Sequence, residues 1–334
     1  MKHMTFRHAA CAFSSLVFLS GAVSQESAAQ AVNLQYGSDN TPGSLPQVTD
    51  LEFIRLVQER SGGKVKITYF DSGQIGTQRE LLQKAKLGTQ DFMSASSIMS
   101  TVLPELGVYD MPYLVKDRAH AECIAKKIIM PKLAPKLEAQ GYKLLGVWEN
   151  GFRQITNNVR PIATPADLKG IKLRVPQGVW RMKMFQAFGA NPAPLAYSET
   201  FVALQTGVMD GQENPYSAIW GAKFNEVQKY LSETNHSYTP LYLIASMARF
   251  KRLPPDIQKL LEQAGADVQA YAFKKSAELD DTDRKKLIAA GMQFNKADRD
   301  TFVAASTPIY EAFGKEVPGG KELVDEVLAL ASGC

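Results

Sequence analysis

The sequence predicts an α/β protein of two domains that are joined by several chain crossings. Strand patterns alternate with helix patterns along the chain, which is typical of sheets covered by helices. Residues 32–334 are too many for one small core and suit two domains of about 150 residues each. The sequence has no internal repeat and no long Pro/Gly linker. We therefore expect the two domains to share the chain at more than one crossing.

The N-terminal segment has the pattern of a cleaved signal peptide. Lys2 and Arg7 precede an apolar run over 9–23. This run is shorter than the roughly 20 apolar residues that a membrane-spanning helix needs. Small residues flank Gln30 in a cleavage pattern, which predicts maturation after Ala31. We expect a periplasmic protein that is not inserted in the membrane.

The first mature elements are a strand and a helix. Val32, Leu34 and Tyr36 alternate with polar residues, so they fall on one side of a strand over 32–36. The loop 37–46 is rich in Gly, Pro, Ser, Asp and Asn, and it marks the end of that strand. Apolar residues at helical spacing over 48–57 then predict a helix that ends near 62.

The elements that follow are predicted by the same criteria. Gly88 stands where a left-handed helix cap is wanted, and Thr164 with Pro165 forms a helix start. A stretch from Pro254 to about Ala290 holds hardly a helix breaker, which predicts one long C-terminal helix. Further strands are expected at 65–69, 92–96, 144–148 and 171–175 in largely parallel sheets, and further helices at 77–87, 165–170, 198–207 and 321–331.

Charge and composition exclude several function classes. The formal net charge is +4 and the basic residues are scattered among acids, so nucleic acid is not an expected partner. His120 and His236 have no ligand at metal-binding spacing, so no metal or cofactor is expected. Cys123 and Cys334 remain after signal cleavage. Either they form a disulfide or they are two free thiols, because their geometry is not readable from the sequence.

The residues with functional character indicate binding rather than reaction. The sequence has no nucleophile elbow, phosphate-binding glycine loop or zinc motif. Arg153 and Asn214 lie in predicted loops, and Arg174 lies near the C-terminal end of a strand, where open α/β sheets bind ligands. Leu173 and Val175 share one strand face, so Arg174 points to the other face and towards a cleft. Its planar guanidinium matches both oxygens of a carboxylate.

A series of motifs resembles one family over nearly the whole mature chain. The sequence is similar to the solute-binding subunit of tripartite ATP-independent periplasmic (TRAP) transporters, of the dicarboxylate-binding type. The motifs that carry this resemblance are Gly73-Gln74-Ile75-Gly76 with Arg79-Glu80, then 87–91, 109–113, 149–153, 168–176, 189–192, 203–207 and 210–215.

The resemblance implies a two-domain clamshell that closes on a small organic acid and delivers it to TRAP membrane subunits. We expect a monomer without catalytic activity. Domain I is expected over 32–150 plus about 240–279, and domain II over 151–239 plus about 280–334. Residues 1–31 are the expected signal peptide.

The resemblance also implies roles for individual residues. The position of Arg174 holds the substrate carboxylate, while Arg153 and Asn214 add hydrogen bonds. The remaining candidates for the pocket are Tyr197, Ser96, Gln78, Asp39, Trp148, Tyr113 and Glu213.

Structural roles compete with these assignments. Arg153 is also a candidate for a structural ion pair and Asn214 for a turn, while Tyr197 and Trp148 are also core candidates. Glu213 would repel an anionic ligand unless it pairs with Arg153 or Arg174.

Two other functions and two ligand classes stay open. The chain is alternatively a sensor module that presents bound ligand to a membrane receptor, or a lyase or isomerase with Glu149 or Glu213 as base. Polar candidates such as Asn40 and Ser97 favour a hydroxylated acid, for example a sugar acid. Trp180 and the other aromatic candidates leave room for an aromatic or branched keto acid.

Overall fold

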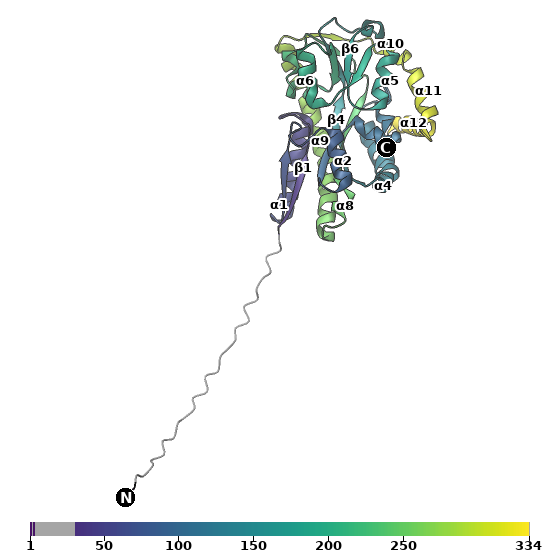
Figure 1. The fold of residues 1–334 in the computed structure, drawn as a ribbon. Helices are drawn as coiled ribbons and strands as arrows, with labels where there is room; N and C mark the ends of the chain where they lie inside the picture. Colours follow the sequence, from purple (N-terminus) through teal and green to yellow (C-terminus); the bar gives the residue numbers. More distant parts are fainter. Residues whose placement is uncertain (2, 4–30, 334) are drawn as a thin grey trace. The chain divides into compact units, whose positions relative to one another are not determined.

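Residues 1, 3 and 31–333 are described by the computed structural model. The predicted signal peptide lies almost wholly outside the described residues, so it stays a prediction. The chain from Ala31 onward forms one compact unit that contains two β-sheets (Figure 1).

Five strands form the first sheet: β1 (Val32–Gly37), β2 (Val65–Phe70), β3 (Phe92–Ala95), β4 (Tyr142–Phe152) and β10 (Tyr238–Ser246). Their order is β2-β1-β3-β10-β4. The pairs β1–β2 and β1–β3 are parallel, whereas β10 runs antiparallel to both β3 and β4. We call it the five-stranded sheet.

Six strands form the second sheet: β5 (Gln154–Asn157), β6 (Lys172–Val175), β7 (Asn191–Pro194), β8 (Gly211–Asn214), β9 (Tyr230–Glu233) and β11 (Gln293–Lys296). Their order is β11-β9-β5-β8-β6-β7. Strand β5 is antiparallel to β8 and β9, while the other pairs are parallel. We call it the six-stranded sheet.

Both sheets are therefore mixed: among the described residues five strand pairs are parallel and four are antiparallel, so the sheets are less parallel than the sequence predicts. Parallel neighbours need a long crossover connection, usually a helix. Strand β4 instead runs almost directly into β5, and β9 leads through residues 234–237 into β10. These short passages link the two sheets without a helical crossover, so nothing imposes a parallel direction on β5 and β10.

Helices pack around both sheets. The α-helices are α1 (Leu45–Arg60), α2 (Gln78–Leu87), α3 (Arg118–Ile124), α4 (Ala134–Ala139), α5 (Val179–Ala187), α6 (Tyr197–Gln205), α7 (Tyr216–Gly221), α8 (Met247–Phe250), α9 (Pro255–Ala289), α10 (Arg299–Ala304), α11 (Thr307–Glu316) and α12 (Gly320–Ala329). Shorter helical turns are η1 (Ser97–Thr101), η2 (Pro104–Asp110), η4 (Pro165–Leu168), η5 (Phe224–Glu226) and η6 (Leu330–Ser332), and η3 (Ala125–Leu133) is a π-helix.

Local sequence signals account for several helix limits. Thr77 and Glu80 form a reciprocal capping box before α2, and Gly88 ends that helix with a φ of 77°. This conformation is left-handed and costs glycine little. Thr164 and Asp167 form a second capping box, but the element that follows is a single 3-10 turn. The predicted long helix is α9, which spans 35 residues.

The chain passes between the sheets at β4–β5, at β9–β10 and along α9, which confirms a clamshell with several crossings. Helix α9 packs on β4 and α1 at one sheet and on α7 at the other. In Figure 1, β1 and α1 lie at one end of the folded unit, β6 and α6 lie at the other, and β4 and α9 lie between them. The limits of the two domains stay a prediction.

Buried apolar side chains form three clusters among the described residues. One cluster fills the space between the five-stranded sheet, α1 and α9, and it contains Tyr36, Phe53, Phe92 and Trp148. The indole Nε1 of Trp148 donates a hydrogen bond of 2.8 Å to the carbonyl of Gly265 in α9. This bond joins the long helix to β4 inside the core.

Cys123 is buried in α3 and is disulfide-bonded. Cys334 lies outside the described residues. The pairing of these two cysteines therefore stays a prediction.

The close approach of α9 to β4 predicts opposite effects for two helical glycines. A Cβ at Gly265 would lie 2.4 Å from the carbonyl oxygen of Leu145, whereas a Cβ at Gly314 in α11 would have its nearest neighbour at 3.4 Å. We expect Gly265→Ala to destabilise the protein by about 1–2 kcal/mol, because backbone overlap outweighs the gain in helix propensity. Gly314→Ala should stabilise it by about 0.5–1 kcal/mol. Urea unfolding of both variants checks the two signs, and equal effects would contradict the packing argument.

Candidate functional site

A polar cleft lies between the two sheets. It has about 620 Å³ of empty volume, the open solvent at its mouth included. One wall, which we call the five-strand wall, consists of Asp39, Asn40, Ser44, Pro46, Gln78, Ser96, Ile98, Asn150 and Leu241. The opposite wall, which we call the six-strand wall, consists of Arg153, Arg174, Pro176, Gln177, Leu195, Ala196, Tyr197, Asn214 and Ala218.

Most of the residues that the sequence singled out come together here. The predicted candidates that line the cleft are Arg174, Arg153, Asn214, Tyr197, Ser96, Gln78 and Asp39.

The structure places the other three candidates elsewhere. Trp148 points into the core on the far face of β4. The hydroxyl of Tyr113 donates to the carbonyl of Thr234, and this side chain lines a separate surface cavity. Glu213 is buried behind the six-strand wall, where it binds Arg153. The aromatic residue Trp180 likewise packs in the core.

Arg174 on β6 reaches the cleft because of strand alternation. Leu173 and Val175 belong to the apolar core, and Arg174 projects from the opposite face. Its Nε and Nη2 donate bonds of 2.9 and 2.7 Å to the carbonyl of Leu195, which fixes the guanidinium plane. Its Nη1 has no hydrogen-bond partner among the described residues and is not among their buried unpaired atoms, so it faces the cleft.

Burial shapes the charge of Arg174. Only 2% of its surface is exposed. Burial, together with the charge of Arg153, lowers the pKa of Arg174 to about 10. The group is still protonated at neutral pH. The cleft therefore holds a cation that has lost water and lies near a second cation. An anionic ligand offsets both the lost hydration and the repulsion between the cations.

Arg153 lies at the passage from β4 to β5. Its backbone N–H donates to the carbonyl of Ser237, at the passage from β9 to β10. Its Nε donates to Glu213, and its Nη2 donates to the Asn214 side-chain oxygen at 2.9 Å. The Nη1 of Arg153 has no partner in the described part of the chain and is not a buried unpaired atom, so it is also open to the cleft.

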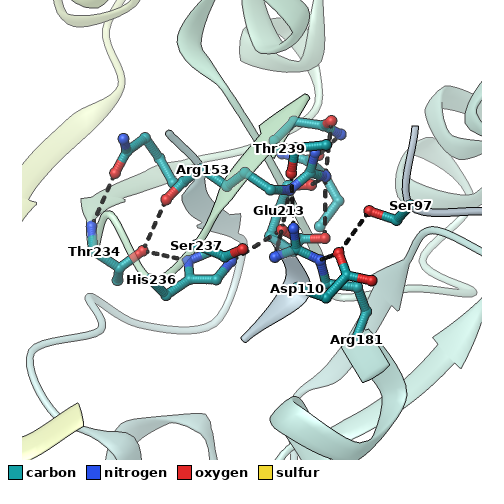
Figure 2. A network of polar contacts seen from close by, with 12 residues as sticks. Ser97, Asp110, Arg153, Arg181, Glu213, Thr234, His236, Ser237 and Thr239 are labelled. Carbon is teal, nitrogen blue, oxygen red and sulfur yellow. Dashed lines mark hydrogen bonds and ion pairs between the residues drawn. The ribbon is translucent and has the colours of Figure 1, made fainter. Parts of the chain in front are cut away.

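Glu213 is the centre of a buried ionic network (Figure 2). In addition to Arg153, it binds His236 at a distance of 3.0 Å between Oε2 and Nε2. The Nη1 of Arg181 lies 3.7 Å from the same oxygen. Arg181 extends the network, because its Nε donates at 3.0 Å to Asp110. Of the two arginines that the sequence offered as partners of Glu213, the structure pairs it with Arg153.

This network fixes the protonation states. Burial works to raise the pKa of Glu213, but the charges of Arg153 and Arg181 lower it below its ordinary value. Glu213 is therefore ionised at neutral pH. Burial lowers the pKa of His236 to about 4, against the raising effect of Glu213. His236 is therefore neutral at neutral pH.

On the five-strand wall, the Gln78 side chain links the Asp39 carboxylate to the backbone of Ser96. The Nε2 of Gln78 donates to the Oδ1 of Asp39 at 2.9 Å, and the Oε1 of Gln78 accepts from the backbone N–H of Ser96 at 3.1 Å. Gln78 is the first residue of α2, so the helix start sets its direction. Burial raises the pKa of Asp39, while Gln78 and the charge of Arg174 lower it.

Sequence reasoning missed several parts of the site. Asn150 and Gln177 line the cleft, and Asn150 lies within a motif that the sequence already singled out. Arg181 carries no local signal, because it lies on a helix between apolar residues. Its partner Asp110 is 71 positions away in the sequence.

Other site types find no support in the described part of the chain. Across residues 31–333, no group of three or more His, Cys, Asp or Glu side chains is placed to hold a metal ion. No helix among the described residues has the length and apolar character to cross a membrane.

Two sheets linked by several crossings, with an arginine-lined cleft between them, define a solute-binding protein. The family model described as bacterial extracellular solute-binding protein, family 7, matches residues 38–316. The chain belongs to this family.

Individual relatives agree with the family match. The chain is 34% identical to the 2,3-diketo-L-gulonate-binding periplasmic protein YiaO of Escherichia coli (strain K12), over 93% of this chain and 97% of that relative. Among solved structures, it is similar to the sugar acid binding protein of Advenella mimigardefordensis in complex with galactonate, with a TM-score of 0.87, 34% identity and coverage of 91% and 98%.

A second solved structure comes from Polaromonas sp. JS666. It is a TRAP periplasmic solute-binding protein bound to D-erythronate, with a TM-score of 0.86 and 33% identity, and the match covers 89% of this chain and 98% of that one. The predicted resemblance to TRAP solute-binding subunits is therefore confirmed.

Proposed function

We propose that this protein binds a small hydroxylated carboxylate, of the sugar-acid type, and delivers it in the periplasm to the membrane subunits of a TRAP transporter. The observation that carries the proposal is the free Nη1 edge of Arg174, held in a buried plane and open to the cleft. The related proteins bind 2,3-diketo-L-gulonate, galactonate and D-erythronate.

The electrostatics of the cleft favour a carboxylate. A carboxylate that enters the cleft loses water, and this loss is tolerable only where fixed donors replace the water. Arg174 and Arg153 supply such donors, and both are already desolvated. An anion bound in the cleft offsets the repulsion between the two cations, because it attracts both of them.

Binding completes the closed state. The cleft takes its walls from both sheets, so a bound ligand contacts both at once. A ligand that binds the closed form better shifts the population towards it. The passages β4–β5 and β9–β10 and helix α9 are the segments that connect the sheets, and we assign the hinge motion to them.

Contacts of the candidate bases support a role without catalysis. His236 has both ring nitrogens engaged, by Glu213 and Thr234. Glu149 binds Arg118 and Ser276 and does not line the cleft. Glu213 is ionised and already bound by Arg153. A general base needs a free, suitably titrating group beside the substrate.

The remaining parts of the proposal concern the cell and the partners. We propose cleavage of residues 1–31, a periplasmic location and a monomeric state. A pull-down with the membrane subunits of a TRAP transporter distinguishes delivery from the sensor alternative, in which a receptor is captured instead.

A thermal-shift screen tests ligand binding. We expect sugar acids such as D-galactonate to raise the unfolding midpoint of the mature protein by several degrees, because ligand binds only the folded state. D-galactose is the matched control, since it lacks the carboxylate, and it should leave the midpoint unchanged. The panel includes an aromatic acid and a branched keto acid as the competing class. A screen in which no carboxylate shifts the midpoint would refute the proposal.

A further inference from the structure

The five-strand wall opposite the arginines presents hydrogen-bond acceptors. Asp39 and Asn40 both line the cleft, and both are more than nine-tenths buried. Two buried groups behind them fix which of their atoms face the ligand.

Asn40 is held with its oxygen towards the cleft. Its Nδ2 donates at 3.1 Å to the Oδ2 of Asp50 and at 2.9 Å to the Oγ of Ser94. Ser94 donates its own hydroxyl hydrogen to Asp50 at 3.1 Å, so its oxygen acts as an acceptor towards Asn40. Both hydrogens of the Asn40 amide are therefore used. Its Oδ1 has no partner among the described residues and is not a buried unpaired atom.

Asp50 is itself fixed from two further sides. Tyr36 and Tyr69 donate their hydroxyl hydrogens to it at 2.6 and 2.9 Å. The four donors leave this fully buried carboxylate in one orientation. Asp50 does not line the cleft, so it acts on the ligand through Asn40 and is a positioning residue.

Asp39 supplies the second acceptor. Its Oδ1 accepts from Gln78, and its Oδ2 accepts no bond from another described residue and is not a buried unpaired atom. The free oxygens of Asp39 and Asn40 thus face the same cleft as the free donors of Arg153 and Arg174.

We infer that Asp39 and Asn40 select ligand hydroxyl groups, and that they exclude a second carboxylate from the five-strand wall. The inference rests on the proposed function, since it concerns the same cleft. A hydroxyl donates to either acceptor. A carboxylate has only acceptors, and beside Asp39 two acids would have to share one proton or repel each other. The protein therefore prefers a polyhydroxy monocarboxylate to a dicarboxylate of equal length.

Two four-carbon acids test this preference. D-erythronate has one carboxylate and three hydroxyls, whereas succinate has two carboxylates and no hydroxyl. We expect calorimetry on the mature protein to show D-erythronate binding at least about 30-fold more tightly than succinate, which corresponds to two lost hydrogen bonds. Comparable affinities for the two acids would overturn this inference and leave the proposed carboxylate binding intact. Binding of neither acid, with no response to D-galactonate, would overturn both.

The Asp39→Asn variant reverses the chemistry of one acceptor. The amide oxygen can still accept from Gln78, so the amide nitrogen becomes a donor into the cleft. We expect D-erythronate affinity to fall by about tenfold and succinate affinity to rise. Thermal unfolding confirms that the variant is folded. A parallel loss for both acids would overturn the selective role of Asp39.

Asp50→Asn tests the positioning of Asn40. The amide at position 50 has one acceptor oxygen where the carboxylate has two, so it cannot serve all four donors. The hold on the Asn40 amide weakens, and the ratio of D-erythronate to succinate affinity should fall towards one. A role in stability alone would weaken both acids equally and leave the ratio unchanged, which would overturn the positioning role. If Asp50→Asn does not fold, Ser94→Ala is the second variant, because it removes the other acceptor of the Asn40 amide. The same ratio of D-erythronate to succinate affinity is then measured, and it should also fall towards one.

Discussion

Replacing Arg174 with lysine should weaken binding of a sugar acid by about 2–4 kcal/mol, or roughly 30-fold to 1000-fold. Lysine keeps the positive charge but lacks the planar guanidinium with its paired N–H donors. In the native protein, Nε and Nη2 bind the carbonyl of Leu195 while Nη1 faces the cleft. A lysine ammonium is a single point charge on a flexible stem. It cannot hold Leu195 and offer the same planar edge to a carboxylate.

Calorimetry with D-galactonate measures this loss. Arg160→Lys is a matched control, because Arg160 belongs to the six-stranded sheet side but does not line the cleft. The Arg160→Lys variant should bind D-galactonate as tightly as the unchanged protein does. Unchanged affinity in Arg174→Lys would remove the carboxylate-holding role from Arg174 and from the proposed function.

The position of Arg174 could be predicted because its signal is local. Two apolar neighbours at alternate positions determine the strand face, and the strand end determines the edge of the sheet. Helix α9 was predicted for the same kind of reason, since its 35 residues contain hardly a helix breaker. Thr77 and Gly88 likewise mark the two ends of α2 through chemistry within one turn.

The ionic network behind the cleft could not be predicted because its contacts are distant in sequence. Arg153 and Glu213 are 60 positions apart, and Arg181 and Asp110 are 71 apart. Strand β8 (Gly211–Asn214) is polar throughout and nonetheless fully buried, since ionic and amide partners replace apolar packing. Nothing in its sequence resembles a core strand.

Trp148 was predicted at the ligand site but lies in the core. It directly precedes the motif 149–153, which made it a candidate for the ligand site. Trp148 and Asn150 are two positions apart, and regular alternation would place them on the same face of β4. The register of β4 against β10 shifts between Glu149 and Gly151, so Trp148 enters the core while Asn150 reaches the cleft. Only the contact with Gly265, which is 117 positions away, places the indole.

The network connects the two passages between the sheets to the cleft. Arg153 is bonded to Ser237 through its backbone and to Glu213 and Asn214 through its side chain, while its remaining edge faces the cleft. If the proposed function holds, a ligand bound to this edge contacts a residue that is bonded to both passages between the sheets. Glu213 holds Arg153 in place when no ligand is present, so its charge supports the folded state as well as the site.

Replacing Glu213 with glutamine should destabilise the protein by about 3–5 kcal/mol. The side chain keeps its shape, but Arg153 and Arg181 lose the buried anion that both face. Their cations are then desolvated with Asp110 as the remaining acid of the network. This cost exceeds that of a lost surface ion pair by severalfold, because Arg181 is fully buried and Arg153 is only 2% exposed, so little water can replace the lost anion.

Urea unfolding at neutral pH measures the change, and Glu326→Gln is the matched control. Glu326 pairs with Lys132 at the surface, where both side chains are exposed, so its loss should cost at most about 0.5 kcal/mol. The folded-state pKa of Glu213 lies below its ordinary value of 4.5, so its contribution is complete above that pH and is lost as the pH falls further. The difference in the free energy of unfolding between the native protein and Glu213→Gln should therefore become smaller at strongly acidic pH. Equal costs for the two glutamine variants at neutral pH would mean that the buried arginines do not depend on Glu213.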